Sequence, residues 1–343
     1  MIKILKFINK IILSNFQRLQ RPYKLTYAVT YDCNLKCKMC FIWKKEKKKE
    51  LSINEIDLFF KKQNYFSWID LTGGEISLRR DLLDIVSIIF KYSRNLCILH
   101  FPTNGQLAGD IIKICKTIKK LSRGVALIVT VGLDGPQHIH NEIRGSSDVW
   151  RNAVETFIGL KRNGFRHVYF GYTLFEYNRS CFEKMFSEIK IVYPAIRHSD
   201  FHCNLISKSA HYFENYNLSI AYNMLTKNSV DFCYMNKKFS FKGLLARRYW
   251  SLATVYTKEK KMPLPCQALS ATVFLDPYGD IYPCISYGHR CCNILDINFD
   301  LDTIWKEKFI NHMYSEISKG ACGGCWTPCE AYPAILGSLW RLS

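Results

Sequence analysis

Strand-like and helix-like segments alternate along residues 25–205. Residues 25–31 (LTYAVTY) have the composition of a buried strand, and residues 53–62 have a helical pattern that follows Ser52, with Glu55 placed as in a capping box. The same patterns continue as strands 68–72, 96–103, 125–133, 168–174 and 198–205 and helices 81–92, 110–121, 149–163 and 180–192. Units repeated at this spacing predict parallel strands joined by right-handed crossovers. We therefore expect an α/β fold built as a partial, open (β/α)6 TIM-like barrel.

Four parts can be distinguished along the chain. They are a basic amphipathic N-terminal helix (1–24), the barrel (25–205), a helical connecting region (206–262) and a small cysteine-rich α+β domain (263–343). Within the last part, residues 272–284 have the pattern of a β-hairpin. The connecting region is rich in aromatic and basic residues, and its sequence does not indicate a task.

The N-terminal segment has a helical period. Seven apolar side chains share one face: Ile4, Leu5, Ile8, Ile11, Ile12, Phe16 and Leu19. Lys3, Lys6 and Lys10 lie opposite. The pattern fits a helix packed against the rest of the protein, and it also fits a helix on a membrane surface through residues 1–19. Both interpretations remain open.

The charge balance is strongly basic, with a formal net charge of +19 over 343 residues. Residues 1–50 carry 13 Lys and Arg against 3 Asp and Glu, so about half of the surplus lies there. Since no aromatic-basic module accompanies it, we do not expect nucleic acid as a partner. No secretion signal is present, and no apolar run reaches the roughly 18 residues that a membrane span needs. We expect a cytoplasmic protein, with peripheral contact to the inner membrane surface as a further option.

Fifteen cysteines are too many for packing alone. Their odd number and the missing signal peptide argue against a disulfide framework and favour metal binding. Three lie within eight residues near the start of the chain, and seven lie from Cys266 onward.

Cys33, Cys37 and Cys40 follow directly on the first predicted strand. Three thiolates can hold three irons of a 4Fe-4S cubane, which usually takes four cysteines, and so leave one iron open. An open iron can bind the amino and carboxylate groups of S-adenosylmethionine (SAM) and pass an electron to its sulfonium, which gives a 5′-deoxyadenosyl radical. The alternative is a zinc loop, but it needs a fourth local ligand, and no other His or Cys lies nearby.

The spacing CxxxCxxC after a first strand resembles the radical SAM superfamily. Further motifs follow the next three strands in order: TGGE at 72–75, TNG at 103–105 and GLDG at 132–135. All of them fall on the rim where barrels of this type build their active sites. The resemblance implies contacts of SAM with Gly73, Gly74, Glu75, Thr103, Asn104, Asp134, Arg144 and Met39. It also implies an electron donor of the reductase, flavodoxin or ferredoxin type.

Two residues depart from the family pattern. Gly132 stands where the SLDG motif has serine, and Met39 stands where an aromatic residue is frequent before the last cysteine. Neither change affects the three cysteines.

The C-terminal cysteines are similar to those of the SPASM and twitch domains, which carry auxiliary 4Fe-4S clusters. Cys266 and Cys284 are separated by 17 residues, with Gly279 five positions before Cys284, and Cys322, Cys325 and Cys329 follow as CxxC-x3-C. The short run resembles the one-cluster twitch type, with Cys266, Cys284, Cys322 and Cys325 as ligands. Cys329 competes for one position, Cys291 and Cys292 are further candidates, and a zinc knuckle is the alternative. Sulfatase-maturing relatives have an acidic residue where this chain has Ile285, which argues against that activity.

The resemblance implies modification of an unactivated C–H position. A peptide or protein is the favoured substrate class, and a carbohydrate-like small molecule and a lipid-linked molecule are alternatives. The hypothesis from another functional class is a non-catalytic metal-binding nucleic-acid protein.

Overall fold

The computed structural model describes residues 2–122, 124–220 and 241–341. One nine-stranded sheet runs through the molecule in the order β6-β5-β4-β3-β2-β1-β7-β8-β9. Neighbouring strands from β1 to β6 are all parallel. These six strands are β1 (Lys24–Thr30), β2 (Trp68–Gly73), β3 (Ile98–Thr103), β4 (Ala126–Gly132), β5 (Val168–Leu174) and β6 (Phe201–Leu205). The expected partial barrel is therefore confirmed, with strand order equal to chain order.

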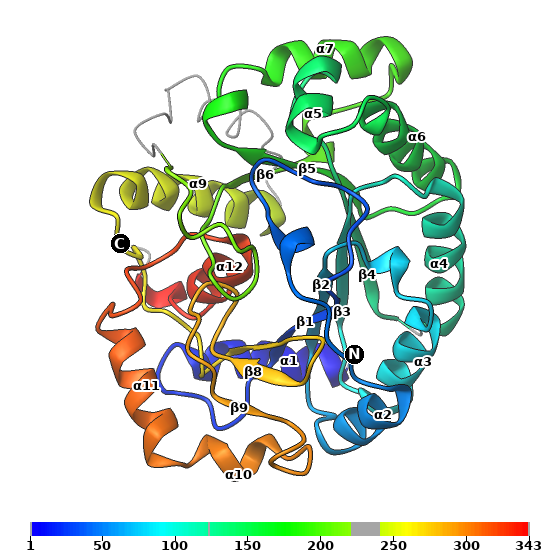
Figure 1. The fold of residues 1–343 in the computed structure, drawn as a ribbon. Coiled ribbons are helices and arrows are strands. Elements are labelled where there is room, and N and C mark those ends of the chain that lie inside the picture. The colour runs from blue at the N-terminus through cyan, green and yellow to red at the C-terminus, as the bar shows by residue number, and fades with distance from the viewer. Residues whose placement is uncertain (1, 123, 221–240, 342–343) are drawn as a thin grey trace.

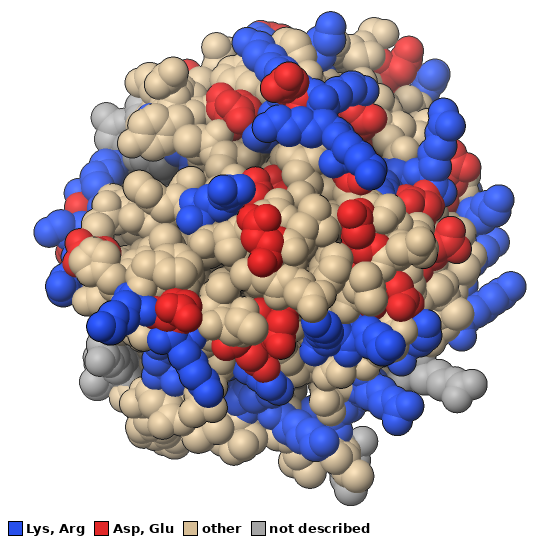
Figure 2. Space-filling model, turned by 60° about the horizontal axis from the view of Figure 1, so that its bottom comes forward, with Lys and Arg blue, Asp and Glu red and all other residues tan. Residues whose placement is uncertain are grey.

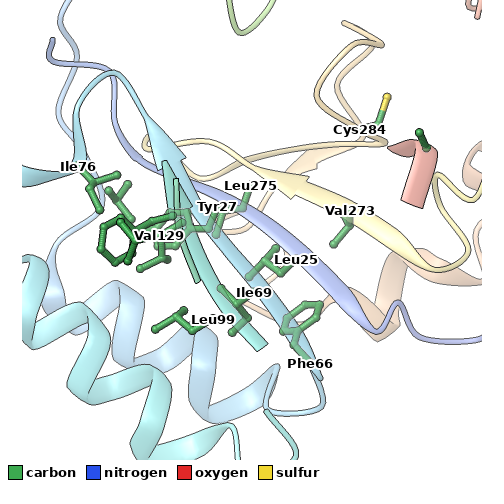
Figure 3. Packing of buried hydrophobic residues seen from close by; sticks show 14 of the residues in the cluster. Leu25, Tyr27, Phe66, Ile69, Ile76, Leu99, Val129, Val273, Leu275 and Cys284 are labelled. Atoms are coloured by element: carbon green, nitrogen blue, oxygen red, sulfur yellow. The ribbon is translucent and has the colours of Figure 1, made fainter. Parts of the chain in front are cut away.

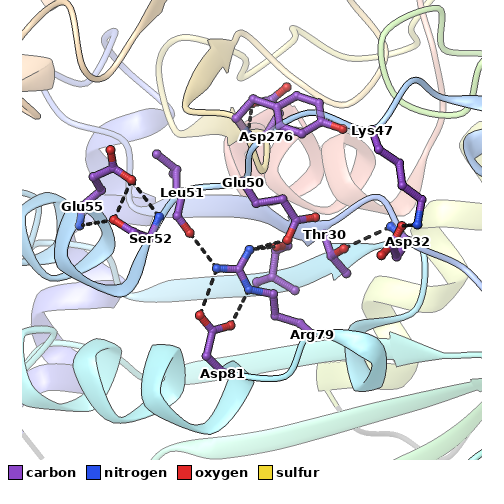
Figure 4. Close-up of polar contacts among 12 residues, drawn as sticks. Thr30, Asp32, Lys47, Glu50, Leu51, Ser52, Glu55, Arg79, Asp81 and Asp276 are labelled. Carbon is purple, nitrogen blue, oxygen red and sulfur yellow. Dashed lines mark hydrogen bonds and ion pairs between the residues drawn. The ribbon is translucent and has the colours of Figure 1, made fainter.

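Helices between the strands form the outer layer of the barrel (Figure 1). They are α2 (Ile53–Lys62), α3 (Leu82–Tyr92), α4 (Ala108–Leu121), α6 (Val149–Arg162) and α7 (Phe182–Val192), whereas α5 (Gln137–Arg144) packs on α6 beside the loop that follows β1. The capping box at the start of α2 is present as expected, with the Glu55 N–H donating to the Ser52 hydroxyl and the Ser52 N–H donating to the Glu55 carboxylate (Figure 4). The helix α5 was not predicted from the sequence.

The C-terminal hairpin extends the barrel sheet. β7 (Thr272–Leu275) lies parallel to β1, with Leu25 opposite Val273, and β8 (Asp280–Tyr282) and β9 (Cys292–Asn293) follow antiparallel. The hairpin was predicted, but its pairing with β1 was not. The helices of this end are α9 (Phe241–Glu259), α10 (Leu301–Trp305), α11 (Lys308–Ser318) and α12 (Pro328–Leu336).

Every residue of β1 is buried, because the strand has packed neighbours on both faces. Leu25 and Tyr27 face the helical layer. They belong to one apolar cluster that includes Ile69 and Leu99 and that continues into the strands on both sides of β1 (Figure 3). Side chains of the opposite parity line the barrel interior, where Lys24 Nζ lies 2.9 Å from a carboxylate oxygen of Asp70. The interior of the barrel thus carries charge, while the sheet–helix interface is apolar.

The helix α1 (Ile2–Ser14) covers the beginnings of the barrel strands. Phe7 packs with Tyr23 and Trp68, directly before β1 and at the start of β2. The expected distribution of faces is only partly right. Lys10, expected on the polar face, turns inward, and its Nζ donates to the Tyr65 carbonyl at 2.7 Å, whereas Leu5 and much of the apolar face point to solvent. Within the described ranges, no helix is long and apolar enough to cross a bilayer.

Candidate functional site

The loop after β1 is held from several sides. The Lys38 N–H donates to the Ile143 carbonyl at 2.8 Å, and the Phe41 N–H donates to the Phe213 carbonyl at 2.8 Å. The Asn215 amide donates to the Met39 carbonyl at 2.9 Å. The conformation that presents the three cysteines is therefore fixed by contacts from α5 and from the segment after β6.

The thiols of this loop lie in an apolar cluster at the barrel rim, together with Leu35 and Met39. Burial raises the pKa of Cys33 to about 11 and that of Cys40 to about 12. Burial also raises the pKa of Cys37, and the Arg144 guanidinium, 3.8 Å from its Sγ, opposes that rise. Three grouped thiols with one cation beside them fit the anionic charge of an iron–sulfur cluster, and binding it would release their protons.

Arg144 is fixed by an ion pair with Asp134. Its Nε donates to the Asp134 carboxylate at 2.8 Å, and the Thr173 N–H donates to the other oxygen of that carboxylate at 2.9 Å. Gly132 makes this arrangement possible, because a Cβ there would lie 2.5 Å from Nη2 of Arg144. The departure from SLDG thus has a local reason: the missing side chain makes room for the guanidinium beside Cys37.

The TGGE turn packs directly on the cysteine loop. The Gly74 N–H donates to the Thr30 carbonyl at 2.9 Å, and a Cβ on Gly74 would lie 2.2 Å from the Asp32 carbonyl oxygen. Gly73 has a φ of +139°, which disfavours other residues. Close approach of two backbones requires both glycines.

Glu75 connects this turn to the end of β3. Its buried carboxylate accepts hydrogen bonds from the Thr103 hydroxyl at 2.9 Å and from the Asn104 N–H at 2.6 Å, and the Ser77 N–H and hydroxyl also donate to it. Burial raises the pKa of Glu75, and these hydrogen bonds oppose the rise. In this structure Glu75 therefore orders the neighbouring residues, and the Asn104 side chain reaches on to Asn34 of the cysteine loop at 2.7 Å.

Two residues of the site were missed from the sequence. Tyr212 bonds through its hydroxyl to the Thr72 hydroxyl at 2.7 Å and to the Gly73 carbonyl at 2.8 Å. Asn215 holds Met39, as described above. Both lie in an irregular segment after β6, where no periodicity marks a functional position, so the sequence offered no signal for them.

Arg79 connects the end of β1 to the segment that precedes α2 (Figure 4). Its guanidinium donates to the Val29 and Leu51 carbonyls at 3.1 and 2.6 Å and pairs with the carboxylates of Glu50 and Asp81. The lysine-rich stretch that ends at Glu50 is thereby tied to the end of β1.

A cavity of 330 Å³ opens beside the cysteine loop. Lys38 and Phe41 of that loop form one wall, and residues 174–177 and 205–206, at the ends of β5 and β6, form another. Most of the lining is apolar, with Lys38, Glu176 and Arg179 as its charged members. Its place at the carboxyl ends of the strands is where barrels of this kind bind substrates.

The C-terminal cysteines form a second group. Burial raises the pKa of Cys266 and Cys284 well above the usual value, and the Glu330 carboxylate and the Cys325 thiol raise both further. Cys322 raises the pKa of Cys266 in the same way. The Sγ atoms also accept hydrogen bonds from backbone N–H groups, from Ala268 at 3.5 Å for Cys266 and from Tyr287 at 3.3 Å for Cys284. Such N–H···S bonds suit thiolate ligands of an iron–sulfur cluster.

Cys329 shares one charged neighbour with this group and has two others in the barrel interior. Burial raises its pKa to about 12, Lys24 lowers it, and Asp70 and Glu330 raise it. It packs in an apolar cluster with Cys33 and Cys40. Cys291 is separate from this group, with its Sγ 3.8 Å from the Met313 sulfur.

The part of the chain that the structure describes contains no group of three or more His, Cys, Asp or Glu side chains arranged for a single metal ion.

Residues 27–189, which span the barrel strands β2–β5 and most of β1, match the protein family described as the radical SAM superfamily. The chain belongs to the radical SAM superfamily. As a member it is a SAM-dependent enzyme, and SAM and a 4Fe-4S cluster are its family's cofactors. A curated relative from Bacillus subtilis (strain 168), the antilisterial bacteriocin subtilosin biosynthesis protein AlbA, is 22% identical over 329 residues, which cover 89% of this chain and 67% of AlbA.

Solved radical SAM structures share the fold. Streptococcus suis SuiB superposes with a TM-score of 0.60 at 16% identity, over 91% of this chain and 70% of SuiB. Native anSMEcpe with bound AdoMet superposes with a TM-score of 0.61 at 19% identity, over 87% of this chain and 84% of anSMEcpe. The likeness therefore extends through the C-terminal part of the chain as well as the barrel.

Proposed function

We propose that this radical SAM enzyme modifies an unactivated C–H position of a peptide or protein. The observation that carries the proposal is the group of Cys33, Cys37 and Cys40 at the barrel mouth, with the Arg144 guanidinium 3.8 Å from the Cys37 thiol and a mostly apolar cavity beside the same loop. When bound there, a 4Fe-4S cluster supplies the electron that cleaves SAM.

The chain's own residues would bind and orient the reactants. Arg144 stays paired with Asp134 and stabilises negative charge on Cys37. Gly73 and Gly74 bring backbone close to the cysteine loop, and Glu75 keeps Thr103 and Asn104 at the same rim. Met39, on the loop itself, provides an apolar surface for the adenine.

A peptide suits the cavity better than a carbohydrate. The lining is mostly apolar, whereas a sugar needs a dense set of hydrogen-bond donors and acceptors. Two relatives support the same class: AlbA acts in subtilosin biosynthesis, and SuiB has been solved bound to its precursor peptide SuiA. An apolar peptide side chain is the expected occupant, with Lys38 and Glu176 contacting polar parts of the peptide.

Cys266, Cys284, Cys322 and Cys325 are the ligands that we propose for one auxiliary 4Fe-4S cluster. Four thiolates would fill all its iron positions, so this cluster would relay electrons and leave SAM cleavage to the first one. An external one-electron donor of the reductase, flavodoxin or ferredoxin type would supply electrons to both clusters.

The test uses anaerobically reconstituted protein, SAM and a reductant. Formation of 5′-deoxyadenosine should depend on Cys33, Cys37 and Cys40. With deuterium-labelled SAM and a cell extract, a peptide should change mass. A mass change confined to sugars or lipids would contradict the peptide assignment.

The cavity can be tested separately by Leu218→Glu, which puts a charge into its apolar wall. Formation of modified peptide should fall by about tenfold or more, since a charge buried against an apolar side chain costs more than 1.4 kcal/mol. Leu58→Glu, on the exposed side of α2, is the matched control, and Leu58 is 43% exposed. Equal rates for the two variants would rule out this cavity as the substrate site.

A further inference from the structure

The solvent-facing side of α1 is apolar. Seven of the seventeen strongly exposed large hydrophobic side chains in the described ranges lie within residues 2–16. Ile2, Leu5 and Phe16 are 71, 58 and 70% exposed. A water-soluble surface seldom carries so many large apolar groups side by side, and such patches mark interaction sites.

This face is continuous and firmly held. Leu5, Ile8, Ile12 and Phe16 follow one another at helical spacing, and the Phe16 ring lies 6.4 Å from the ring of Trp340, which is itself 71% exposed. The Asn15 side chain fixes the C-terminal segment beside α1, since its amide donates to the Leu336 carbonyl at 2.9 Å and its oxygen accepts from the Leu339 N–H. We call these five side chains, Leu5, Ile8, Ile12, Phe16 and Trp340, the apolar face.

Positive charge surrounds the apolar face. Residues 2–21 contain five Lys and Arg and no Asp or Glu. Lys6 is exposed on α1, and Arg18, Arg21 and Lys306 line a neighbouring hollow of 510 Å³ whose single acidic member is Asp302. Lys and Arg also predominate around the periphery of the surface shown in Figure 2, while acidic side chains gather nearer its middle.

The positive charge around the apolar face favours an anionic lipid surface over a second copy of this chain as its binding partner. A second copy packed on the same face would bring two sets of the exposed cations, Lys6 and Lys306 among them, close together, which is unfavourable. Anionic lipid headgroups would neutralise them, while the acyl region takes up the apolar side chains.

We propose that the apolar face of α1 docks the enzyme on an anionic membrane surface. Because α1 packs over the beginnings of β1–β3, this contact lies at the end of the barrel opposite the cysteine loop and the cavity. The docked enzyme therefore keeps its mouth open to water. A lipid-linked substrate in the same membrane would not reach the mouth, whereas a peptide in solution would.

The test is flotation of the reconstituted, full-length protein with vesicles of phosphatidylcholine alone or mixed with phosphatidylglycerol. Wild-type protein should float with the mixed vesicles and less so in high salt. Leu5→Glu/Phe16→Glu should lower the partition coefficient by about tenfold or more. Ile191→Glu, which changes an 80% exposed side chain on α7, is the matched control and should float as the wild type does.

Three outcomes would overturn the proposal. They are absence of flotation, equal flotation of the double variant and the wild type, and a dimer in solution that the double variant abolishes, which would make the face a contact between copies. 5′-Deoxyadenosine formation in the double variant shows that it folds, and it reports on the proposed function independently.

Hydrogen exchange of the vesicle-bound protein tests the orientation. Residues 2–16 should become protected, and residues 174–177 at the mouth should not. Protection of the residues at the mouth, without protection of α1, would contradict the proposed orientation.

Discussion

At the scale of single residues, the geometry around the three cysteines depends on buried charged side chains, each of which has only a few polar partners. Arg144 is the clearest case, since one guanidinium serves both the fully buried Asp134 and the Cys37 thiol. Gly132 and Arg144 were each noted in the sequence, but their mutual contact was not, because it depends on the distance between two loops. Motif matching located the residues, and only the fold shows which pairs act together.

Arg144→Met should destabilise the protein strongly, because it leaves the Asp134 carboxylate buried without its cation. We expect a loss of about 3–5 kcal/mol in the free energy of unfolding of the metal-free protein. The matched control is Arg151→Met, which breaks an exposed pair with Asp148 and should cost about 0–1 kcal/mol. Denaturant titration measures both losses. Equal losses would show that the buried pair contributes no more to the free energy of unfolding than the exposed pair does.

Asp276 gives a prediction for pH. Burial raises its pKa to about 6, although the Tyr278 and Asp280 N–H groups donate to it. The folded protein thus binds a proton more tightly than the unfolded chain does, so stability falls as the pH rises from about 4 to about 6 and the loss persists above. Asp276→Asn keeps the hydrogen-bond acceptor and should stabilise by roughly 2 kcal/mol near pH 7.5 but hardly at all near pH 4. An equal effect at both pH values in denaturant titrations would contradict this explanation.

At the scale of elements, the sequence predicted the alternation of strands and helices well, because periods of 2 and 3.6 residues are local properties. It did not predict that β7 joins β1, since pairing between distant strands leaves no local pattern. The face of α1 is another example: periodicity showed an amphipathic helix, but Phe7 and Ile11 pack inward while Leu5 and Ile12 stay exposed. A helical period shows that one face of a helix is apolar, but it does not show whether that face packs against the protein or stays exposed to solvent.

Lys24 connects three elements inside the barrel. Its Nζ lies 2.9 Å from Asp70 on β2 and donates to the Cys329 carbonyl on α12 at 2.6 Å. Lys24→Met should therefore lower the free energy of unfolding by about 3–5 kcal/mol, because Asp70 is left buried without its main cation. Lys24→Met/Asp70→Leu should recover part of that loss, and denaturant titration of both variants checks it. A double variant less stable than the single one would contradict the interpretation.

At the scale of the whole molecule, two groups of cysteines lie in loops around one continuous sheet, the first after β1 and the second around the β7–β8 hairpin and before α12. Cys329 packs against the same apolar cluster as Cys33 and Cys40 and lies in the first turn of α12, which follows the second group. The sequence predicted both groups from spacing, and it left Cys329 among the candidate ligands, which stays a prediction. The contact of its carbonyl with Lys24 could not be read from the short CxxC-x3-C run.

Iron content tests the assignment of ligands. A Cys33/Cys37/Cys40→Ala triple variant should keep about four irons after anaerobic reconstitution, and a Cys322/Cys325→Ala variant should also keep about four. Cys329→Ala should keep the wild-type amount of about eight. A triple variant without iron would contradict the auxiliary cluster, and a large loss in Cys329→Ala would make that residue a ligand.

The most direct test of the central claim is the EPR spectrum of the reduced, reconstituted Cys322/Cys325→Ala variant, recorded with and without SAM. If Cys33, Cys37 and Cys40 leave one iron of a cubane open, SAM should change the spectrum of the remaining cluster. An identical spectrum in both conditions would contradict the account, and so would a SAM-dependent change that survives in the Cys33/Cys37/Cys40→Ala variant.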